Sequence, residues 1–298
     1  MLTVRNASLL HTLRRIQFIM PLTIEEFLRL AAQKLEAISP SPRLDAEVLA
    51  MHVCGLDRSA LITRAHAELE AAQQKELDYL LARRQRGEPI AYLTGTREFW
   101  SMALNVSPAT LIPRPETELL VEKALVLIPP EAAWIIADLG TGTGAVALAV
   151  AKERPRCRVI ATDFLPAALN VARSNVKKFG LTNVELRQGD WFIPLAGEKL
   201  DMLVSNPPYV CANDPHLQQG DVRFEPMSAL ASGDDGLDAI RQIAAQAQQY
   251  LKPGGWLLLE HGFDQADAVA GLLRQQGYRD IVSYRDLSGN YRVTECRR

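Results

Sequence analysis

Residues 134–151 read WIIADLGTGTGAVALAVA. The stretch opens with an apolar run that is typical of a buried strand, and it closes with good helix formers at 145–151. Between these two parts, Gly140, Gly142 and Gly144 occupy alternate positions. Glycine tolerates positive φ angles and lets a ligand approach the backbone closely, so the pattern is typical of a ligand-binding turn. The stretch therefore predicts one strand, turn and helix unit of an α/β sheet.

The turn Gly140-Thr141-Gly142-Thr143-Gly144 is placed to bind a cofactor of the nucleotide type. A predicted strand at 158–162 follows it and ends in Asp163, where a carboxylate would hold ribose hydroxyls. A dinucleotide such as NAD fits the same fingerprint, and a purely structural glycine turn is a further alternative. Alternate glycines with an acidic residue two positions before the first resemble the S-adenosylmethionine loop more closely. We therefore expect S-adenosylmethionine, bound by the turn residues and Asp163.

A third segment predicts a place for the adenine ring of that cofactor. The strand expected at 184–188 leads into Asp190 and Trp191. The Asp190 carboxylate would accept a hydrogen bond from the adenine amino group, and Trp191 would pack on the ring. A tryptophan at this position is also consistent with a residue of the hydrophobic core, so both interpretations of Trp191 are kept.

The tetrapeptide Asn206-Pro207-Pro208-Tyr209 follows another apolar run, 200–205, which predicts a buried parallel strand. Ligands of open α/β sheets bind beyond the carboxyl ends of strands, where this tetrapeptide lies. Its prolines lack backbone donors and have fixed φ angles, so the turn is stiff and rich in acceptors. Asn206 adds a side-chain carbonyl and Tyr209 adds a flat aromatic face. Such a turn suits a planar group that carries an NH2, which is an amide or an exocyclic amine.

The composition is that of an ordinary globular protein, with 298 residues, 48% hydrophobic residues and a formal net charge of −2. No apolar stretch approaches the ~20 residues that span a bilayer, so no membrane partner is expected. Domains that hold nucleic acids are usually basic, so the charge argues against a stable nucleic-acid partner. The four cysteines are widely spread without a CxxC pair, which argues against a metal site or a disulfide framework.

The first part of the chain predicts a helical domain. Residues 1–19 carry arginines and no acidic residue, and we interpret them as a start extension or flexible tail that precedes the true initiator, Met20. A mitochondrial targeting segment is the alternative. Residues 20–88 show helical periodicity and predict an all-α domain that would dock the substrate. Thr23 and Glu26 form a capping box at its start.

Residues 89–112 predict a linker with a β-hairpin, and 113–298 predict an α/β domain. In that domain helical segments alternate with seven expected strands, near 134–139, 158–163, 184–188, 200–205, 255–261, 280–285 and 291–296. The short turn Ser288-Gly289-Asn290 makes the last two strands an antiparallel hairpin. The predicted fold class is α/β, with a doubly wound, mostly parallel seven-stranded sheet and a small all-α N-terminal domain.

Several motifs together resemble the PrmC/HemK family, which methylates the side-chain amide of glutamine in peptide chain release factors. They are the glycine turn, the tetrapeptide 206–209 and the segments 89–95, 111–118, 223–226 and 259–262. A similar tetrapeptide occurs in amino-methyltransferases of DNA and RNA, so on its own it is only moderately specific. The segment 111–118 (LIPRPETE) at this distance upstream makes the resemblance much more specific.

The resemblance implies a Rossmann-like class I fold and a defined reaction. The enzyme would transfer a methyl group from S-adenosylmethionine to N5 of the glutamine in the Gly-Gly-Gln motif of class 1 release factors, which modulates translation termination. Asn206, Pro207 and Tyr209 would be the catalytic residues. These three and Pro208 would bind the glutamine, and Asn206 would also contact the cofactor.

Two further expectations come from the same segments. Arg114 and Glu116 would line the substrate entrance, although a structural ion pair is an equal alternative. The same acceptor turn would also suit an N6-adenine methyltransferase that acts on DNA or RNA, with Tyr209 stacking on a flipped base. The expected location is the cytoplasm, or the mitochondrion if residues 1–19 are a targeting segment.

Overall fold

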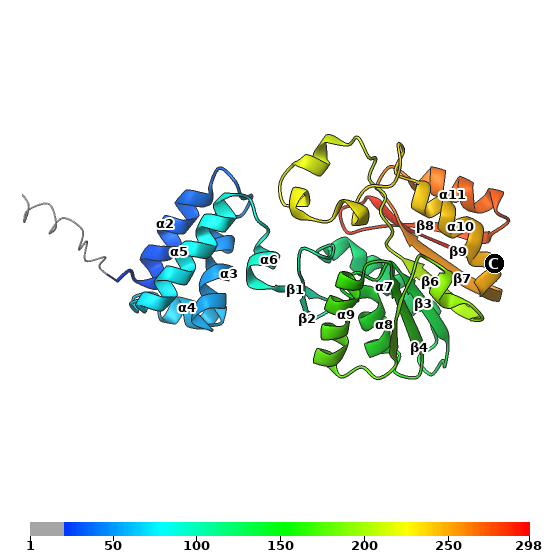
Figure 1. Ribbon diagram of the computed structural model, residues 1–298, viewed down its shortest axis with the longest axis horizontal. Helices are drawn as coiled ribbons and strands as arrows, with labels where there is room; N and C mark the ends of the chain where they lie inside the picture. Colours follow the sequence, from blue (N-terminus) through cyan, green and yellow to red (C-terminus); the bar gives the residue numbers. More distant parts are fainter. Residues whose placement is uncertain (1–20) are drawn as a thin grey trace, which may run out of the picture. The chain divides into compact units, whose positions relative to one another are not determined.

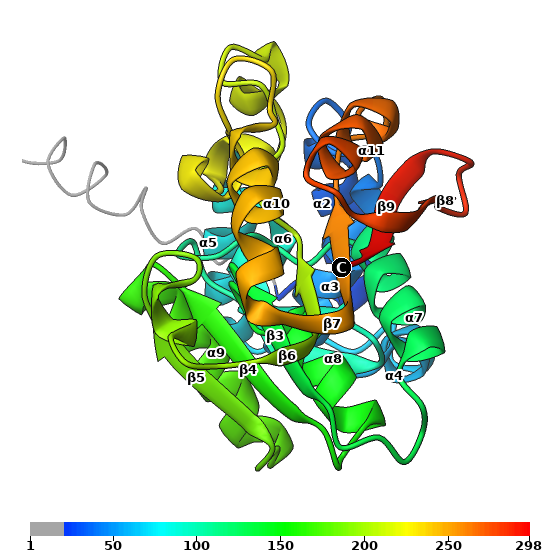
Figure 2. The same cartoon turned by 90° about the vertical axis from the view of Figure 1, so that its right-hand side faces the viewer.

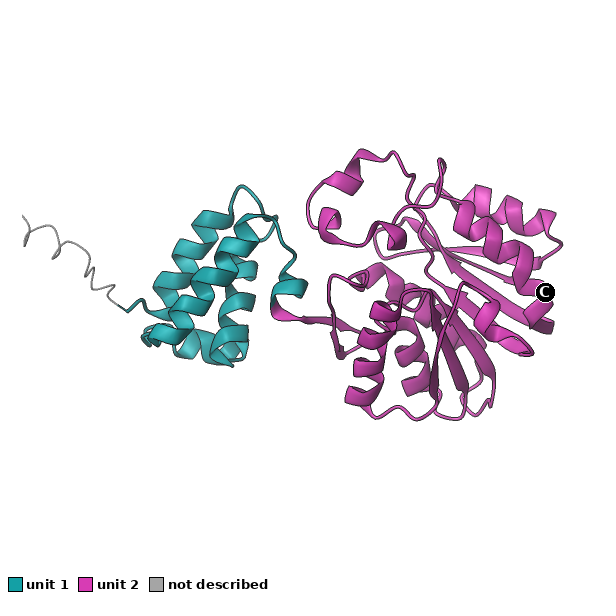
Figure 3. Ribbon diagram, viewed as in Figure 1, with its two compact units in different colours: residues 1–93 teal, residues 94–298 magenta. Residues whose placement is uncertain are grey.

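The structure is a computed structural model that describes residues 21–298. The chain divides into two compact units, the first ending at Leu93 and the second spanning Thr94–Arg298 (Figure 3). The apolar core of the first unit and the two core clusters of the second contain separate sets of residues. The expected extension at 1–19 and the expected initiator Met20 lie outside the described residues.

The first unit is an all-α bundle, as predicted. Its helices are α2 (Ile24–Leu35), α3 (Pro42–Cys54), α4 (Arg58–Thr63), α5 (Ala71–Gln85) and most of α6 (Ile90–Thr94). The expected capping box begins α2. The Glu26 N–H donates to Thr23 Oγ1 over 3.2 Å, and the Thr23 N–H donates to Glu26 Oε2 over 2.9 Å. Two otherwise unpaired amides at the helix start are thereby satisfied.

The second unit begins with the expected β-hairpin, which consists of β1 (Thr96–Phe99) and β2 (Met102–Asn105). Its turn residues Trp100 and Ser101 have φ angles of 52° and 53°. Two-residue hairpin turns favour such angles because they match the twist of the flanking strands. The chain then continues through a short 3-10 helix, η2 (Pro115–Thr117), into α7 (Glu118–Leu127).

The remainder of the second unit is built on one seven-stranded sheet. Its strands are β3 (Ile135–Leu139), β4 (Arg158–Asp163), β5 (Val184–Gln188), β6 (Leu200–Ser205), β7 (Leu251–Glu260), β8 (Arg279–Arg285) and β9 (Tyr291–Arg297). They lie in the order β5-β4-β3-β6-β7-β9-β8, with only the two pairings of β9 antiparallel. The predicted fold class is therefore confirmed, including the C-terminal antiparallel hairpin.

Helices cover both faces of this sheet (Figures 1 and 2). On one face lie α7, α8 (Ala145–Glu153) and α9 (Pro166–Phe179), and on the other lie α10 (Asp238–Tyr250) and α11 (Ala266–Gln275). Neighbouring residues of β3 therefore enter different core clusters, with Ile136 in one and Ala137 in the other. This burial on both faces explains why the strands read as continuous apolar runs.

The sheet order places two connections side by side. The strands β3 and β6 are neighbours, yet the helix after β3 covers one face and α10, which follows β6, covers the other. Such a switch point opens a crevice at the carboxyl ends of the strands. The glycine turn follows β3 and the tetrapeptide 206–209 follows β6, so both lie at this crevice. Among the described residues, no helix has the length and apolarity needed to cross a membrane.

Candidate active site

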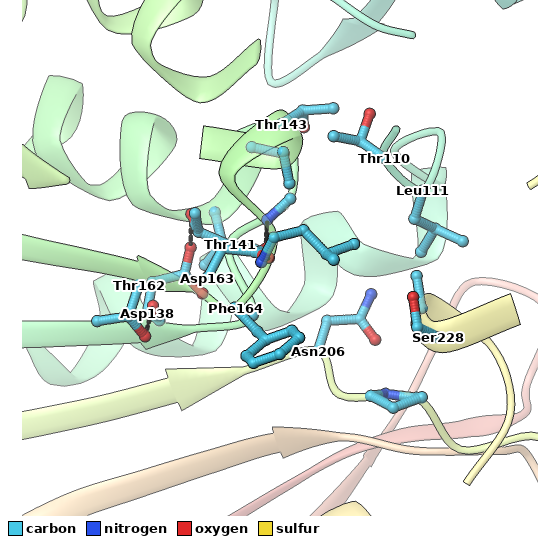
Figure 4. A pocket seen from close by; sticks show the side chains of 18 of the residues that line it. Thr110, Leu111, Asp138, Thr141, Thr143, Thr162, Asp163, Phe164, Asn206 and Ser228 are labelled. Carbon is cyan, nitrogen blue, oxygen red and sulfur yellow. Dashed lines mark hydrogen bonds between the residues drawn. The ribbon is translucent and has the colours of Figure 1, made fainter. Parts of the chain in front are cut away.

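A pocket of about 260 Å³ joins the segments that follow β3, β4, β5 and β6. Figure 4 shows Asp138, Thr141 and Asp163 on one side of it, Leu111 and Ser228 on the other, and Asn206 between the two groups. The predicted residues that line it are Arg114, Gly140, Thr141, Gly142, Thr143, Asp163, Asp190, Trp191, Asn206 and Pro208. Segments that were singled out separately in the sequence thus share one cavity.

The glycine turn has a backbone conformation that side chains disfavour. Gly142 has a φ angle of 55°, and a Cβ placed there would meet no atom within 4 Å. Gly144 has a φ angle of 85°, and a Cβ there would lie 2.5 Å from Leu148 Cδ1. Gly142 is therefore required for conformation and leaves open space beside the pocket, whereas Gly144 is also required for packing against α8.

Asp138 fastens this turn to the start of α8. Its side chain is buried, and Oδ2 accepts hydrogen bonds from Thr141 Oγ1 at 2.6 Å and from the Ala147 N–H at 3.2 Å. Burial raises the pKa of Asp138 to about 6, and these two hydrogen bonds oppose that rise. The carboxylate therefore acts as an internal acceptor that stabilises the turn conformation.

Asp163, at the end of β4, holds the same turn from the other side. Its Oδ2 accepts from the Gly142 N–H and its Oδ1 accepts from the Leu165 N–H, each at 2.9 Å. Burial raises the pKa of Asp163, while these backbone hydrogen bonds lower it. A carboxylate offers about four acceptor sites, so Asp163, which lines the pocket, keeps acceptor capacity for a hydroxyl group there.

Trp191 lies between the pocket and the core, and its packing on an adenine ring stays a prediction. It lines the pocket, and it also packs against the core cluster that contains Leu139 and Leu203. A Cβ on Gly140 would lie 4.0 Å from Cζ3 of its ring, so the indole lies against the glycine turn. Phe164 also lines the pocket and is 66% exposed, which is high for a large apolar side chain. These two aromatic residues give the pocket apolar surfaces on which a flat ring can pack.

Asn206 lies directly after β6, which Ser205 ties to β3 through a 2.8 Å hydrogen bond from Oγ to the Leu139 carbonyl. The Asn206 Nδ2 group donates to Thr117 Oγ1 at 3.1 Å. Among the described residues, no donor reaches Asn206 Oδ1 or the carbonyl oxygen of Pro207. The turn therefore keeps two oxygen acceptors unpaired, and Asn206 lines the pocket.

Tyr209 does not line the pocket and instead anchors the turn from behind. Its hydroxyl donates to Glu260 Oε1 at 3.3 Å, and its carbonyl accepts from Gln265 Nε2 at 3.0 Å. A Cβ on Gly236 would lie only 2.2 Å from that carbonyl oxygen, so the backbone is closely packed here. Gly144, Pro207 and Glu116 are likewise absent from the pocket lining, although Pro207 belongs to the same turn.

Arg114 lines the pocket and forms an ion pair with Glu225, whose side chain is fully buried. The second carboxylate oxygen, Glu225 Oε2, accepts from the Ile112 N–H at 2.9 Å. The pair therefore links the segment before η2 to the irregular segment that follows the tetrapeptide. Arg114 therefore forms a structural ion pair at the pocket wall, and its contact with a substrate stays a prediction.

Comparison with known proteins identifies the family. The model for the PrmC N-terminal domain matches residues 26–95, and a methyltransferase domain model matches residues 131–277. The release factor glutamine methyltransferase of Escherichia coli (strain K12) is 51% identical over 270 residues, which cover 91% of this chain and 97% of that protein. The chain belongs to the release factor glutamine methyltransferase family. The family protein of Vibrio cholerae serotype O1 is 50% identical over 280 residues, which cover 92% and 96%.

Solved structures agree with the fold. A crystal structure of a methyltransferase from Pyrococcus furiosus matches with a TM-score of 0.51 and covers 76% of this chain and 98% of that chain. Its sequence is 18% identical, so it supports the fold alone. Together with the methyltransferase domain match, these findings confirm the predicted family, fold and enzyme class.

Sequence reasoning missed several residues of this family member's pocket. Phe164 directly follows Asp163, so its proximity to the predicted ribose site was a usable signal. Ser228 comes from η6 (Met227–Ala229), in a segment of short 3-10 turns without a periodic pattern, and no sequence signal pointed to it. Thr117, which lines the pocket, and Glu260, which is buried and outside its lining, belong to segments that carry the family resemblance, but no local pattern gives either a role.

The residues present fit a nucleoside-type methyl donor. Asp163 retains acceptor capacity, Gly142 leaves space beside the backbone, and Phe164 and Trp191 offer apolar faces. Within residues 21–298, no group of three or more His, Cys, Asp or Glu side chains is arranged to hold a metal ion.

Proposed function

We propose that this protein transfers a methyl group from S-adenosylmethionine to the side-chain amide nitrogen of a glutamine in peptide chain release factors. Relatives that carry this name are about half identical over nearly the whole chain. The observation that carries the proposal is the single pocket that contains both the glycine turn and Asn206. A methyl donor and an amide acceptor must meet in one cavity, and this pocket supplies a place for each.

The cofactor would be held by the β3, β4 and β5 side of the pocket. The glycine turn, 140–144, would approach the methionine part, and Asp163 would accept hydrogen bonds from the ribose hydroxyls. Asp190 and Trp191 would contact the adenine ring. When bound, S-adenosylmethionine supplies a methyl group on a positively charged sulfur, which is a good leaving group.

The turn after β6 would orient the glutamine amide. An amide nitrogen is a weak nucleophile because its lone pair is delocalised, so orientation has to contribute several kcal/mol of rate acceleration. Asn206 Oδ1 and the Pro207 carbonyl, both without donors among the described residues, would accept the two N–H groups. The nitrogen would then face the methyl group, and Pro208, which lines the pocket, would limit rotation of the amide plane while Tyr209 braces the turn from behind.

The substrate is proposed to be a folded release factor with its glutamine in a Gly-Gly-Gln loop. Arg114 lies at the pocket wall, where it would contact the incoming loop. The helical segment 20–88 would provide the docking surface, with 89–112 as the linker and 113–298 as the catalytic domain. The proposed place of action is the cytoplasm, where release factors act on ribosomes.

Mapping of the methyl group tests this function directly. The purified protein is incubated with isotopically labelled S-adenosylmethionine and a release factor, and the product is digested for peptide mass spectrometry. The label is expected on the Gly-Gly-Gln glutamine and absent from a Gln→Ala release factor. Label on another residue, or on DNA or RNA offered in parallel, would reject the proposal.

A further inference from the structure

Glu260 is a buried acid whose position the fold alone does not explain. It ends β7 and is only 1% exposed. Its Oε1 accepts from the Tyr209 hydroxyl, while its Oε2 has no hydrogen-bond partner within standard geometry among the described residues. Burial of a carboxylate that is not fully paired is costly, so a compensating benefit is expected.

Thr117 connects this acid to the pocket. Its hydroxyl lowers the pKa of the Glu260 carboxyl, so it lies close to that group, and the free Oε2 is the acceptor that it would meet. The hydroxyl oxygen of Thr117 accepts from Asn206 Nδ2 at 3.1 Å. A hydroxyl has a single proton, so a Thr117 that donates to a carboxylate can only accept from Asn206.

The order of donors and acceptors therefore has a direction. An ionised Glu260 can only accept hydrogen bonds. If Thr117 donates its proton to Glu260, its oxygen can only accept from Asn206, so the Asn206 amide must turn its NH2 group towards Thr117. Its oxygen is then left for the pocket. Without this constraint the amide has two orientations of nearly the same shape, which differ only in their hydrogen bonds.

We infer that Glu260 is a positioning residue, which acts through Thr117 to present the oxygen of the Asn206 amide to the substrate and through Tyr209 to brace the same turn. The inference rests on the proposed function, because only a substrate with N–H groups requires an oxygen at this place. It assigns to Glu260 and Thr117 a role that goes beyond holding the fold.

The charge state of Glu260 decides whether this arrangement exists. Burial raises its pKa to about 7, and the groups that face it are Thr117 and Glu116 from η2, Tyr209 and Arg292. Above that pKa the carboxylate accepts from Tyr209, and its free Oε2 can accept from Thr117. Below it the added proton makes Glu260 a donor to Thr117, and the constraint on Asn206 is lost. Activity that depends on this network therefore falls as the pH drops through about 7.

Four variants test the inference with the full-length protein, a release factor and S-adenosylmethionine. Glu260→Gln removes the charge, Thr117→Val removes the hydroxyl, and Thr117→Ser restores it. The matched control is Glu295→Gln, because Glu295 is also a buried glutamate that accepts from a tyrosine hydroxyl, that of Tyr284 at 2.8 Å, and it does not line the pocket.

The expected result is a loss of kcat of roughly 100-fold for Glu260→Gln and for Thr117→Val, the size of effect that misplacing a reacting group by about 1 Å produces. Cofactor affinity should stay unchanged, and Thr117→Ser and Glu295→Gln should keep kcat near that of the wild type. The fall in kcat below pH 7 should disappear in Glu260→Gln. Any decrease in kcat near pH 6 that comes from protonation of Asp138 should persist in this variant.

Two outcomes would overturn the inference while leaving the proposed function intact. One is a Glu260→Gln variant that is as fast as the wild type with an unchanged pH profile. The other is an equal loss of kcat in Glu260→Gln and Glu295→Gln, which would indicate a general structural effect. A wild-type protein that transfers no methyl group to the release factor would reject the proposed function itself, and the inference with it.

Discussion

The glycine turn and the turn at Asn206 form two walls of one pocket, but they are held in different ways. Thr141 bonds to Asp138, three residues away, and Gly142 bonds to Asp163, 21 residues away on the adjacent strand. Asn206, in contrast, bonds to Thr117, which lies 89 residues away. The cofactor side is thus a local motif, whereas the substrate side depends on the assembled fold. The two sides should therefore respond differently to mutation.

Removal of the Asn206 side chain gives the sharpest separation of the two sides. We expect Asn206→Ala to reduce kcat by roughly 100-fold or more, because the amide of the substrate loses an orienting acceptor. Cofactor affinity should stay within a few-fold of wild type, since the glycine turn makes no hydrogen bond to this residue. Steady-state kinetics and calorimetric titration with S-adenosylmethionine measure the two quantities. A parallel loss of both would mean that Asn206 mainly shapes the cofactor site.

The buried acid behind the Asn206 turn should lower stability. Burial raises the pKa of Glu260 to about 7 in the folded protein, so the folded state binds the proton more tightly than the unfolded chain. The wild type therefore loses stability as the pH rises through that range. Glu260→Gln should exceed the wild type in unfolding free energy by roughly 3 kcal/mol at pH 8.

Urea denaturation at two pH values checks this expectation. The advantage of Glu260→Gln should shrink towards pH 5, where the wild-type carboxyl is protonated in the folded state. A glutamine variant that is less stable than the wild type at pH 8 would show that the carboxylate contributes to folding rather than opposing it.

On the other wall, Asp163→Ala should affect cofactor binding first. The loss of a charged acceptor for the ribose should weaken affinity by roughly 1.5–3 kcal/mol. The released Gly142 N–H adds to this effect because the glycine turn loses one of its restraints. Titration calorimetry supplies the affinity, and kcat at saturating cofactor should fall much less than in Asn206→Ala. Unchanged affinity would contradict the ribose assignment.

A pair of glycine variants gives the smallest but most closely matched comparison. Gly142 and Gly236 have φ angles of 55° and 77°, so alanine at either position should cost about 1–2 kcal/mol of stability from the left-handed backbone. Only at Gly236 would the new Cβ collide with the Tyr209 carbonyl. Gly142→Ala should therefore weaken cofactor binding, and Gly236→Ala should lower kcat at an unchanged cofactor affinity. If both variants changed cofactor affinity and kcat in the same way, the proposed difference between the two walls would be contradicted.

The elements of the α/β unit could be predicted well because apolar runs and turn residues are local signals. The start of β7 is a boundary that these local signals do not predict. It was expected from residue 255, but it begins at Leu251, which pairs with Leu200 before a register shift. Pro253, Gly254 and Gly255 disfavour a strand in isolation, and pairing with the neighbouring β6 overrides that preference.

The residues of the candidate site also differ in whether local signals predict them. The residues of the glycine turn and Asp163 were predictable because a strand and a turn define where they lie. The partners of the Asn206 turn were not. Glu260 and Gln265 lie 51 and 56 residues from Tyr209 in the chain, and only the sheet order brings them behind it. A sequence pattern shows which groups can react but does not show which distant side chains hold them.

A crystal structure with S-adenosylhomocysteine and a Gly-Gly-Gln peptide tests the central claim most directly. We expect the nucleoside to lie against Asp163 and the glycine turn, and the glutamine amide nitrogen to lie about 3 Å from Asn206 Oδ1. The Asn206 NH2 group should still face Thr117. A glutamine side chain bound outside this pocket, or an Asn206 amide turned so that its nitrogen meets the substrate, would contradict the account.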